Sequence, residues 1–147
     1  MTDSSRRTFA AAAAATVAAI AVPRVAQAQA AAASRNRALF QVSDNDPARW
    51  NLILSNVGNL REGVGGEGAE IEIVAYGPGL LMLRADSPVK QRVADALKQG
   101  VRINACQNTM QAMKLAPADM LPEIGYVPSG VVEVMKKQQQ GWAYIRS

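Results

Sequence analysis

The fold is decided by a ten-residue stretch that reads Val-Arg-Ile-Asn-Ala-Cys-Gln-Asn-Thr-Met from Val101 to Met110. Its first five residues form a compact apolar run of the kind expected in a short buried strand. The residues from Gln107 to Leu115 then predict a helix. Cys106 is therefore expected at the carboxyl end of a strand and at the start of a helix, and this junction sets the pattern for the chain.

The same alternation of strand and helix extends along the chain on both sides of this junction. Further strands are predicted at 38–42, 70–76, 124–127 and 142–145, and further helices at 47–61, 88–99 and 131–140, with short helical pieces at 80–83 and 116–121. In the second strand, Ile71, Ile73 and Ala75 alternate with Glu70, Glu72 and Val74, which predicts one face buried more fully than the other. Short apolar strands that alternate with helices are typical of a parallel sheet covered on both faces, so the predicted class is α/β.

The first thirty residues predict an export signal. Arg6-Arg7-Thr8-Phe9 precedes an alanine-rich apolar run at 10–22, and Ala-x-Ala steps follow before residue 30. The run is shorter than the roughly 20 residues that a membrane-spanning helix needs. Because the paired arginines resemble a twin-arginine (Tat) signal, we expect a cleaved leader at 1–30, a tether at 31–37 and one domain at 38–147. The mature protein would be periplasmic, with no membrane span.

Composition excludes several classes of function. The net charge of +4 falls to +2 when the leader, with three arginines and one aspartate, is removed, and the remaining charges are scattered. We therefore expect neither nucleic acid nor an anionic membrane as a partner. The absence of histidine excludes Ser-His-Asp and Cys-His nucleophile systems and metal sites built on imidazole. No carboxylate spacing resembles an EF-hand, so no metal and no cofactor are expected.

The single cysteine is the leading candidate for chemistry. In open α/β sheets, ligands bind beyond the carboxyl ends of the strands, where three segments are expected to meet. A helix N-terminus at Cys106 would stabilise a thiolate, which is the nucleophilic form of the side chain. We therefore predict Cys106 as the catalytic residue. Weaker binding roles are predicted for seven others: Ser43, Asp44, Asn45, Gly77, Gly79, Asn108 and Thr109.

Structural interpretations of these residues remain open. A free cysteine often fills space in a core, no Lys, Arg or His adjoins Cys106, and Arg102 is expected to be too far away to help. Asp44 and Asp46 form a carboxylate pair in sequence, yet Asp46 before Pro47 is the pattern of a helix cap. Gly77-Pro78-Gly79 is equally typical of a plain turn or an anion cradle.

The chain resembles the DsrE/DsrF-like family across about residues 37 to 146. The segments that carry the resemblance are 40–47, 50–51, 74–79, 101–110 and 127–133. The resemblance implies a flavodoxin-like three-layer domain with a five-stranded, mainly parallel sheet, and homo-oligomers, commonly trimers or hexamers, or assemblies with related subunits. It also implies that Cys106 matches the cysteine on which cytoplasmic members carry sulfur as a persulfide. The predicted export signal distinguishes this chain from those cytoplasmic members.

Three hypotheses follow for the function of the chain. In the first, a periplasmic sulfur-relay protein carries sulfane sulfur on Cys106 between a donor and an acceptor, either of which is a protein or a small sulfur compound. In the second, a non-catalytic oligomeric module binds a small anion or a partner, and Cys106 is structural. In the third, Cys106 forms a redox-sensing disulfide across a subunit interface.

Overall fold

A single parallel sheet of five strands organises the protein. The computed structural model describes residues 36–66 and 68–147. Its strands lie in the order β4-β3-β2-β1-β5 and every neighbouring pair is parallel. They are β1 (Asn36–Val42), β2 (Ala69–Ala75), β3 (Arg102–Cys106), β4 (Gly125–Val127) and β5 (Ala143–Ile145). The predicted α/β class and five-stranded parallel sheet are confirmed.

The amino-terminal predictions fall largely outside this description. The predicted leader at 1–30 lies outside the described residues, and so does the predicted tether as far as residue 35. Asn36 and Arg37, which we expected in the tether, belong to β1, where they pair with Ala69 and Glu70 of β2. The first strand therefore begins earlier than its apolar run, because backbone pairing with a neighbour extends it.

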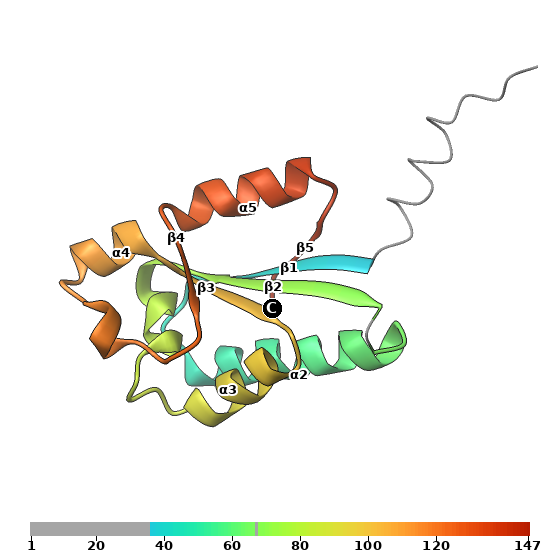
Figure 1. Cartoon of the computed structure of the whole chain (residues 1–147), viewed down its shortest axis with the longest axis horizontal. Coiled ribbons are helices and arrows are strands. Elements are labelled where there is room, and N and C mark those ends of the chain that lie inside the picture. The colour runs from blue at the N-terminus through green and yellow to red at the C-terminus, as the bar shows by residue number, and fades with distance from the viewer. Residues whose placement is uncertain (1–35, 67) are drawn as a thin grey trace, which may run out of the picture.

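Helices cover both faces of the sheet (Figure 1), with α2 and α3 on one side and α5 on the other. This arrangement gives the three layers expected of a flavodoxin-like domain. The helices are α2 (Pro47–Gly63), α3 (Lys90–Lys98), α4 (Gln107–Ala112) and α5 (Gly130–Gln139), and the 3₁₀ segments are η1 (Gly77–Leu83) and η2 (Pro117–Asp119). Helix α3 begins at Lys90, after the predicted Pro88, because Pro88 and Val89 form the turn that precedes it.

The start of α2 has the predicted cap. Asp46 has extended backbone, and its carboxylate accepts hydrogen bonds from the N–H groups of Ala48 at 2.9 Å and Arg49 at 3.4 Å. Pro47 occupies the first helical position, where its missing N–H costs nothing. Asp46 therefore acts as a helix cap rather than as half of a carboxylate pair.

The larger core lies between the sheet and the layer that contains α2, α3 and η1. It includes Phe40 and Ile73 from the sheet and Trp50, Leu80 and Val93 from the covering segments. A smaller core lies beneath α5, on the opposite face. Its buried members are Leu39, Val74, Val127, Val134 and Trp142. Burial on both faces explains why the strands are short apolar runs.

Segment η1 passes very close to the end of β1. A Cβ atom added at Gly79 would lie 2.4 Å from the backbone oxygen of Val42, so this position accommodates only glycine without a backbone shift. Gly77 begins the same segment with a φ of +53°. The Gly-Pro-Gly sequence thus opens a 3₁₀ helix that crosses the carboxyl edge of the sheet.

Strand β2 contains a buried carboxylate, that of Glu72. We expected the face with Glu70, Glu72 and Val74 to be the less buried one, yet Glu72 is 1% exposed and Val74 is fully buried. The carboxylate of Glu72 lies 2.8 Å from Nζ of Lys137 in α5 and accepts a hydrogen bond from Asn104 at 3.0 Å. Burying a charge is tolerated where it is paired and hydrogen-bonded. The predicted difference between the faces is confined to Glu70, which is half-buried, because the paired charges allow α5 to cover the rest of this face.

No described helix combines the length and the apolar character that crossing a membrane requires.

Candidate functional site

Cys106 ends β3 and precedes α4, as the sequence predicted. It is 4% exposed and is the N-cap residue of α4, with extended backbone at φ −75° and ψ 115°. The next turn is tied to the neighbouring connection, because the Asn108 N–H donates to the Pro128 oxygen at 3.2 Å. This bond brings the start of α5 beside the start of α4. The sulfur therefore lies where two helices begin.

Four donors converge on the sulfur. They are the Thr109 hydroxyl and the backbone N–H groups of Gly130, Thr109 and Asn108, of which the Asn108 N–H is shared with the Pro128 oxygen. Burial raises the pKa of the Cys106 thiol, but these hydrogen bonds lower it by more, so that the pKa lies below its ordinary value. The fold therefore favours the thiolate without any neighbouring Lys, Arg or His.

Thr109 links the sulfur to the end of the adjacent strand. The Gly77 N–H, just beyond β2, donates to the Thr109 hydroxyl oxygen at 3.0 Å. A hydroxyl has one proton to donate, and the Thr109 proton is directed to Cys106. Gly77, Asn108 and Thr109, all predicted as weak binding residues, therefore gather around the cysteine. Gly79 instead allows η1 to pass close to the end of β1.

Gly130 is a site residue that the sequence prediction missed. It opens α5 and donates its N–H to Cys106, although it lies 24 positions further along the chain. A Cβ added at Gly130 would lie 2.8–2.9 Å from side-chain atoms of Tyr76. The available signal was the start of the helix predicted at 131–140, but the position of that start beside Cys106 depends on strand order.

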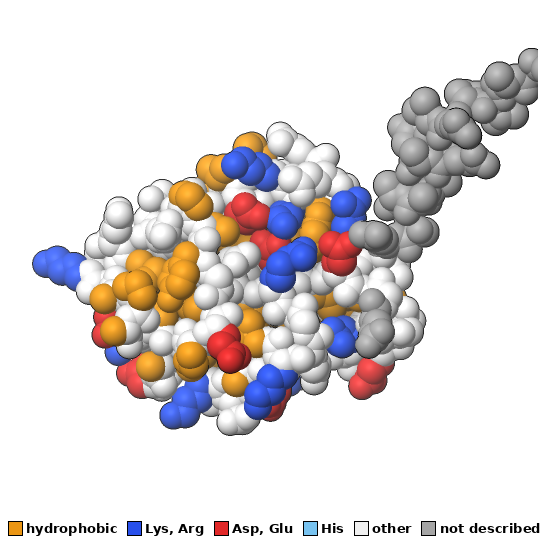
Figure 2. Space-filling view, viewed as in Figure 1, with side chains coloured by type: hydrophobic (Ala, Val, Ile, Leu, Met, Phe, Trp, Pro, Cys, Tyr) orange, Lys and Arg blue, Asp and Glu red, His pale blue; other side chains and the backbone are white. Residues whose placement is uncertain are grey.

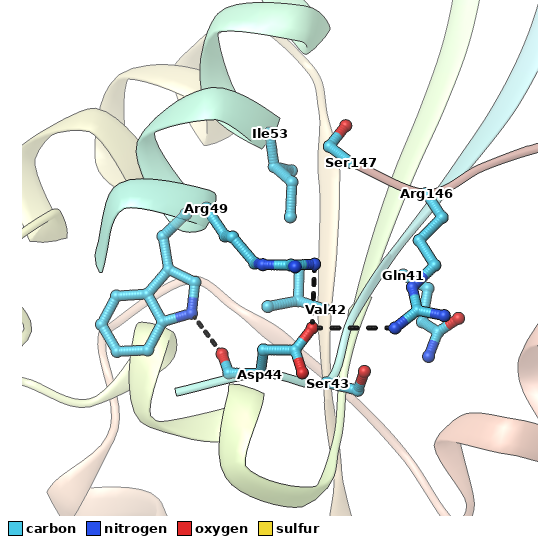
Figure 3. Close-up of a pocket in the computed structure, with 9 residues that line it drawn as sticks. Gln41, Val42, Ser43, Asp44, Arg49, Ile53, Arg146 and Ser147 are labelled. Carbon is cyan, nitrogen blue, oxygen red and sulfur yellow. Dashed lines mark hydrogen bonds and ion pairs between the residues drawn. The ribbon is translucent and has the colours of Figure 1, made fainter. Parts of the chain in front are cut away.

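Ser43 and Asp44 belong to a separate small cavity (Figure 3). The Asp44 carboxylate lies 3.5 Å from Arg49 and 4.0 Å from Arg146, and its backbone oxygen accepts a hydrogen bond from the Trp50 indole at 2.8 Å. The cavity volume of about 10 Å³ gives room for about one water molecule. Cys106 does not line it. Asn45 is exposed in the loop before α2.

Among the described residues there is no group of three or more His, Cys, Asp or Glu side chains that could hold a metal ion. The chemistry that the arrangement supports is that of a stabilised thiolate in a neutral surrounding. Such a group attacks electrophilic sulfur or carbon, or holds a sulfur atom covalently.

Comparison with known proteins shows the family of the chain. A family profile described as "DsrE/DsrF-like family" matches residues 3–146. The chain belongs to the DsrE/DsrF-like family. This match confirms the resemblance that the sequence segments carried, including the one around Cys106. No curated protein sequence matches the chain.

Several solved structures share the fold. Protein MTH1491 of Methanobacterium thermoautotrophicum, a protein of unknown function, is 40% identical with a TM-score of 0.72, and the match covers 76% of this chain and 98% of that one. Protein BT1422 of Bacteroides thetaiotaomicron, also of unknown function, is 14% identical with a TM-score of 0.64 over 76% and 95%. The ychN protein of E. coli is 12% identical with a TM-score of 0.62 over 77% and 99%. The last two similarities concern the fold alone.

Proposed function

We propose that this DsrE/DsrF-like protein is a sulfur-relay protein that carries sulfane sulfur as a persulfide on Cys106. The observation that carries the proposal is the convergence of four hydrogen-bond donors on the single thiol. Donors that stabilise a thiolate equally suit the departing thiolate when the sulfur is passed on. Family membership supports the same type of function.

The transfer step needs no cofactor and no external oxidant. The Cys106 thiolate attacks the outer sulfur of a donor persulfide, R–S–SH, and forms a new S–S bond. The donor S–S bond breaks, and R–S⁻ leaves with the bonding electron pair, so that Cys106–S–SH remains. Discharge is the same reaction with an acceptor thiolate as the attacking group. Sulfur is exchanged between thiols and no net oxidation occurs.

Loading with sulfur tests this proposal directly. The purified protein is incubated with a polysulfide or with thiosulfate, and its intact mass is recorded beside that of Cys106→Ser. The proposal expects wild type to gain one sulfur atom and Cys106→Ser to gain none. Equal gain by both proteins, or no gain by wild type, would contradict it.

The burial of Cys106 favours a second candidate, an oligomeric module that binds a small anion or a partner and uses the cysteine for packing. A side chain only 4% exposed must become more accessible before it can meet a bulky donor. Alkylation over a range of pH separates the candidates. Fast alkylation at mildly acidic pH rejects the module, whereas slow alkylation with an ordinary or raised pKa supports it.

We further propose that the protein is exported to the periplasm by the twin-arginine route and assembles into a trimer or hexamer, or with related subunits. The order of paired arginines, apolar run and Ala-x-Ala steps in the predicted leader supports export. Exposed apolar side chains on α5 support assembly: Val131, Val132 and Met135 are 60%, 41% and 49% exposed. Figure 2 shows hydrophobic side chains at the surface near α5. Cell fractionation and light scattering test these two statements.

A further inference from the structure

A cavity of about 450 Å³ lies where α4, η2 and the end of β4 meet. Its volume falls in the range of cavities that hold small-molecule ligands. Met110 of α4, Leu115 just beyond that helix and Pro117 of η2 form an apolar part of its lining. In Figure 2, hydrophobic side chains gather at the surface over this part of the molecule. Of the site residues predicted from the sequence, only Asn108 lines the cavity.

The cavity lies beside Cys106, although Cys106 itself does not line it. Gln107 and Asn108, which form one wall, directly follow Cys106 in the chain. On the other wall, Tyr126 and Pro128 flank the β4 residue that pairs with Cys106. The Asn108 N–H donates to the Pro128 oxygen at 3.2 Å and joins the two walls. Because consecutive Cα atoms are about 3.8 Å apart and neighbouring strands about 4.8 Å apart, both walls begin next to the cysteine.

The described residues that line this cavity include no charged side chain. Its polar side-chain groups are the amides of Gln107, Asn108 and Gln111 and the Tyr126 hydroxyl, and none of them is hydrogen-bonded to another described residue. Each of these groups offers both a donor and an acceptor. Two other cavities, of about 240 and 380 Å³, each contain an arginine and a carboxylate. The uncharged cavity favours an uncharged ligand with amide groups, because a charged ligand would lose water without gaining an ionic partner.

The burial of Cys106 limits the form of this ligand. The cysteine is 4% exposed, so the group that exchanges sulfur with it has to be slender. Strand β4 is three residues long, and Pro128, which follows it, has no N–H. An extended peptide would therefore find only a short row of backbone groups beside the cavity. Both observations favour a small molecule with an unbranched thiol arm over a peptide segment of a partner protein.

We propose that this cavity binds the low-molecular-weight thiol with which Cys106 exchanges sulfur, and that this thiol is uncharged and carries amide groups. The inference rests on the proposed sulfur-relay function and names its substrate class. The side-chain amides bind the body of the ligand, Met110 and Leu115 pack against its carbon chain, and the thiol arm extends towards Cys106. The ligand arrives as the persulfide R–S–SH, the Cys106 thiolate attacks its outer sulfur, and R–S⁻ leaves with the bonding electron pair.

The test separates binding from sulfur transfer by using ligands that cannot exchange sulfur. S-methylpantetheine is uncharged and carries amides, whereas S-methylglutathione carries amides together with carboxylates and an ammonium group. Each is titrated into the isotope-labelled protein, and the side-chain NH₂ signals of Gln107, Asn108 and Gln111 are followed by NMR. Gln111→Ala removes one amide from the cavity. Gln139→Ala is the matched control, because Gln139 is an exposed glutamine of α5 outside the cavity.

We expect S-methylpantetheine to shift these signals saturably and S-methylglutathione to bind at least about tenfold more weakly, because its charges would be buried without partners. Gln111→Ala should weaken the binding of S-methylpantetheine by roughly three- to tenfold, through the loss of a hydrogen bond, and Gln139→Ala should not change it. The absence of saturable shifts, or equal binding of the two ligands, overturns the inference. Tighter binding of the blocked peptide acetyl-Ala-Ser-Ala-amide also overturns it and assigns the cavity to a partner peptide.

Sulfur transfer distinguishes the failure of this inference from the failure of the relay function. Pantetheine persulfide should load Cys106 with a lower KM than glutathione persulfide when loading is followed by intact mass. Loading from polysulfide without binding of S-methylpantetheine overturns the inference alone. Binding of S-methylpantetheine without loading from any of the donors contradicts the relay function alone.

Discussion

At the scale of single residues, the lowered pKa of the Cys106 thiol depends on uncharged donors. Burial alone would give a thiol with a raised pKa, and such cysteines are inert. The Thr109 hydroxyl and three backbone N–H groups reverse the direction of the shift. Because most of these donors belong to the backbone, few side-chain substitutions can remove them.

Thr109 offers the most direct substitution. Thr109→Val keeps the shape of the side chain but removes the donor, and should raise the pKa of the Cys106 thiol by about one unit, since a hydrogen bond to a charged group contributes roughly 1.5 kcal/mol. Thr109→Ser should retain the wild-type value. The measurement is the pH dependence of alkylation. Equal profiles for Thr109→Val and Thr109→Ser would show that the hydroxyl does not act on the sulfur.

Gly130 tests the contribution of α5. Gly130→Ala places a methyl group 2.8 Å from the Tyr76 side chain, so the start of α5 must move away from the sulfur. We expect a loss of about 1–3 kcal/mol in the free energy of unfolding and a raised thiol pKa. Gly58→Ala is the control, because a Cβ there meets nothing within 4 Å in the interior of α2. It should stabilise the protein by roughly 0.5–1 kcal/mol. Similar losses in both variants would refute the steric argument.

At the scale of elements, α5 is held to the sheet by a cluster of charges near its carboxyl end. Lys137 pairs with Glu72 at 2.8 Å and with Glu133 at 3.5 Å, and it lies 4.5 Å from the centre of the Trp142 ring. Arg102 adds a second contact to Glu72 at 3.3 Å. The charged side chains between α5 and β1 are visible in Figure 2. This cluster fixes one end of the helix whose other end supplies the Gly130 donor.

Lys137→Met should loosen that attachment. It leaves the buried Glu72 carboxylate with the exposed Arg102 and with Asn104, and we expect a loss of about 3 kcal/mol in urea unfolding, because a buried charge loses its closest partner. Lys136→Met, which changes the exposed neighbour, should cost little. The thiol pKa should rise in Lys137→Met and stay constant in Lys136→Met. If both variants unfold at the same urea concentration, the cluster does not anchor α5.

At the scale of the whole molecule, features that depend on residues close in sequence were predicted better than features that depend on residues far apart in sequence. The strand–helix alternation, the cap at Asp46 and the position of Cys106 between β3 and α4 were predicted, since each depends on residues close in sequence. The burial of Glu72 was missed because it depends on a partner 65 positions away in α5. Gly130 was missed for the same reason. Its contact with the site follows from strand order and register, which no local pattern contains.

Assembly belongs to the same scale. If the exposed apolar residues of α5 form a subunit interface, Met135→Glu should reduce the mass measured by light scattering towards that of one chain while far-ultraviolet circular dichroism stays unchanged. A charge buried in an interface is costly, which gives the direction of the effect. Gln139→Glu, at an exposed position at the end of α5, is the control. A monomeric wild type, or an unaltered mass in Met135→Glu, would contradict assembly through this surface.

The proposed relay function requires that Cys106 both takes up sulfur and gives it away. The most direct measurement is an intact-mass time course of the purified protein, first with polysulfide and then, after removal of the donor, with a small thiol as acceptor. We expect wild type to gain one sulfur atom and to lose it to the acceptor, while Cys106→Ser stays at its starting mass throughout. A wild-type protein that takes up no sulfur, or that retains it in the presence of excess acceptor, would contradict the claim.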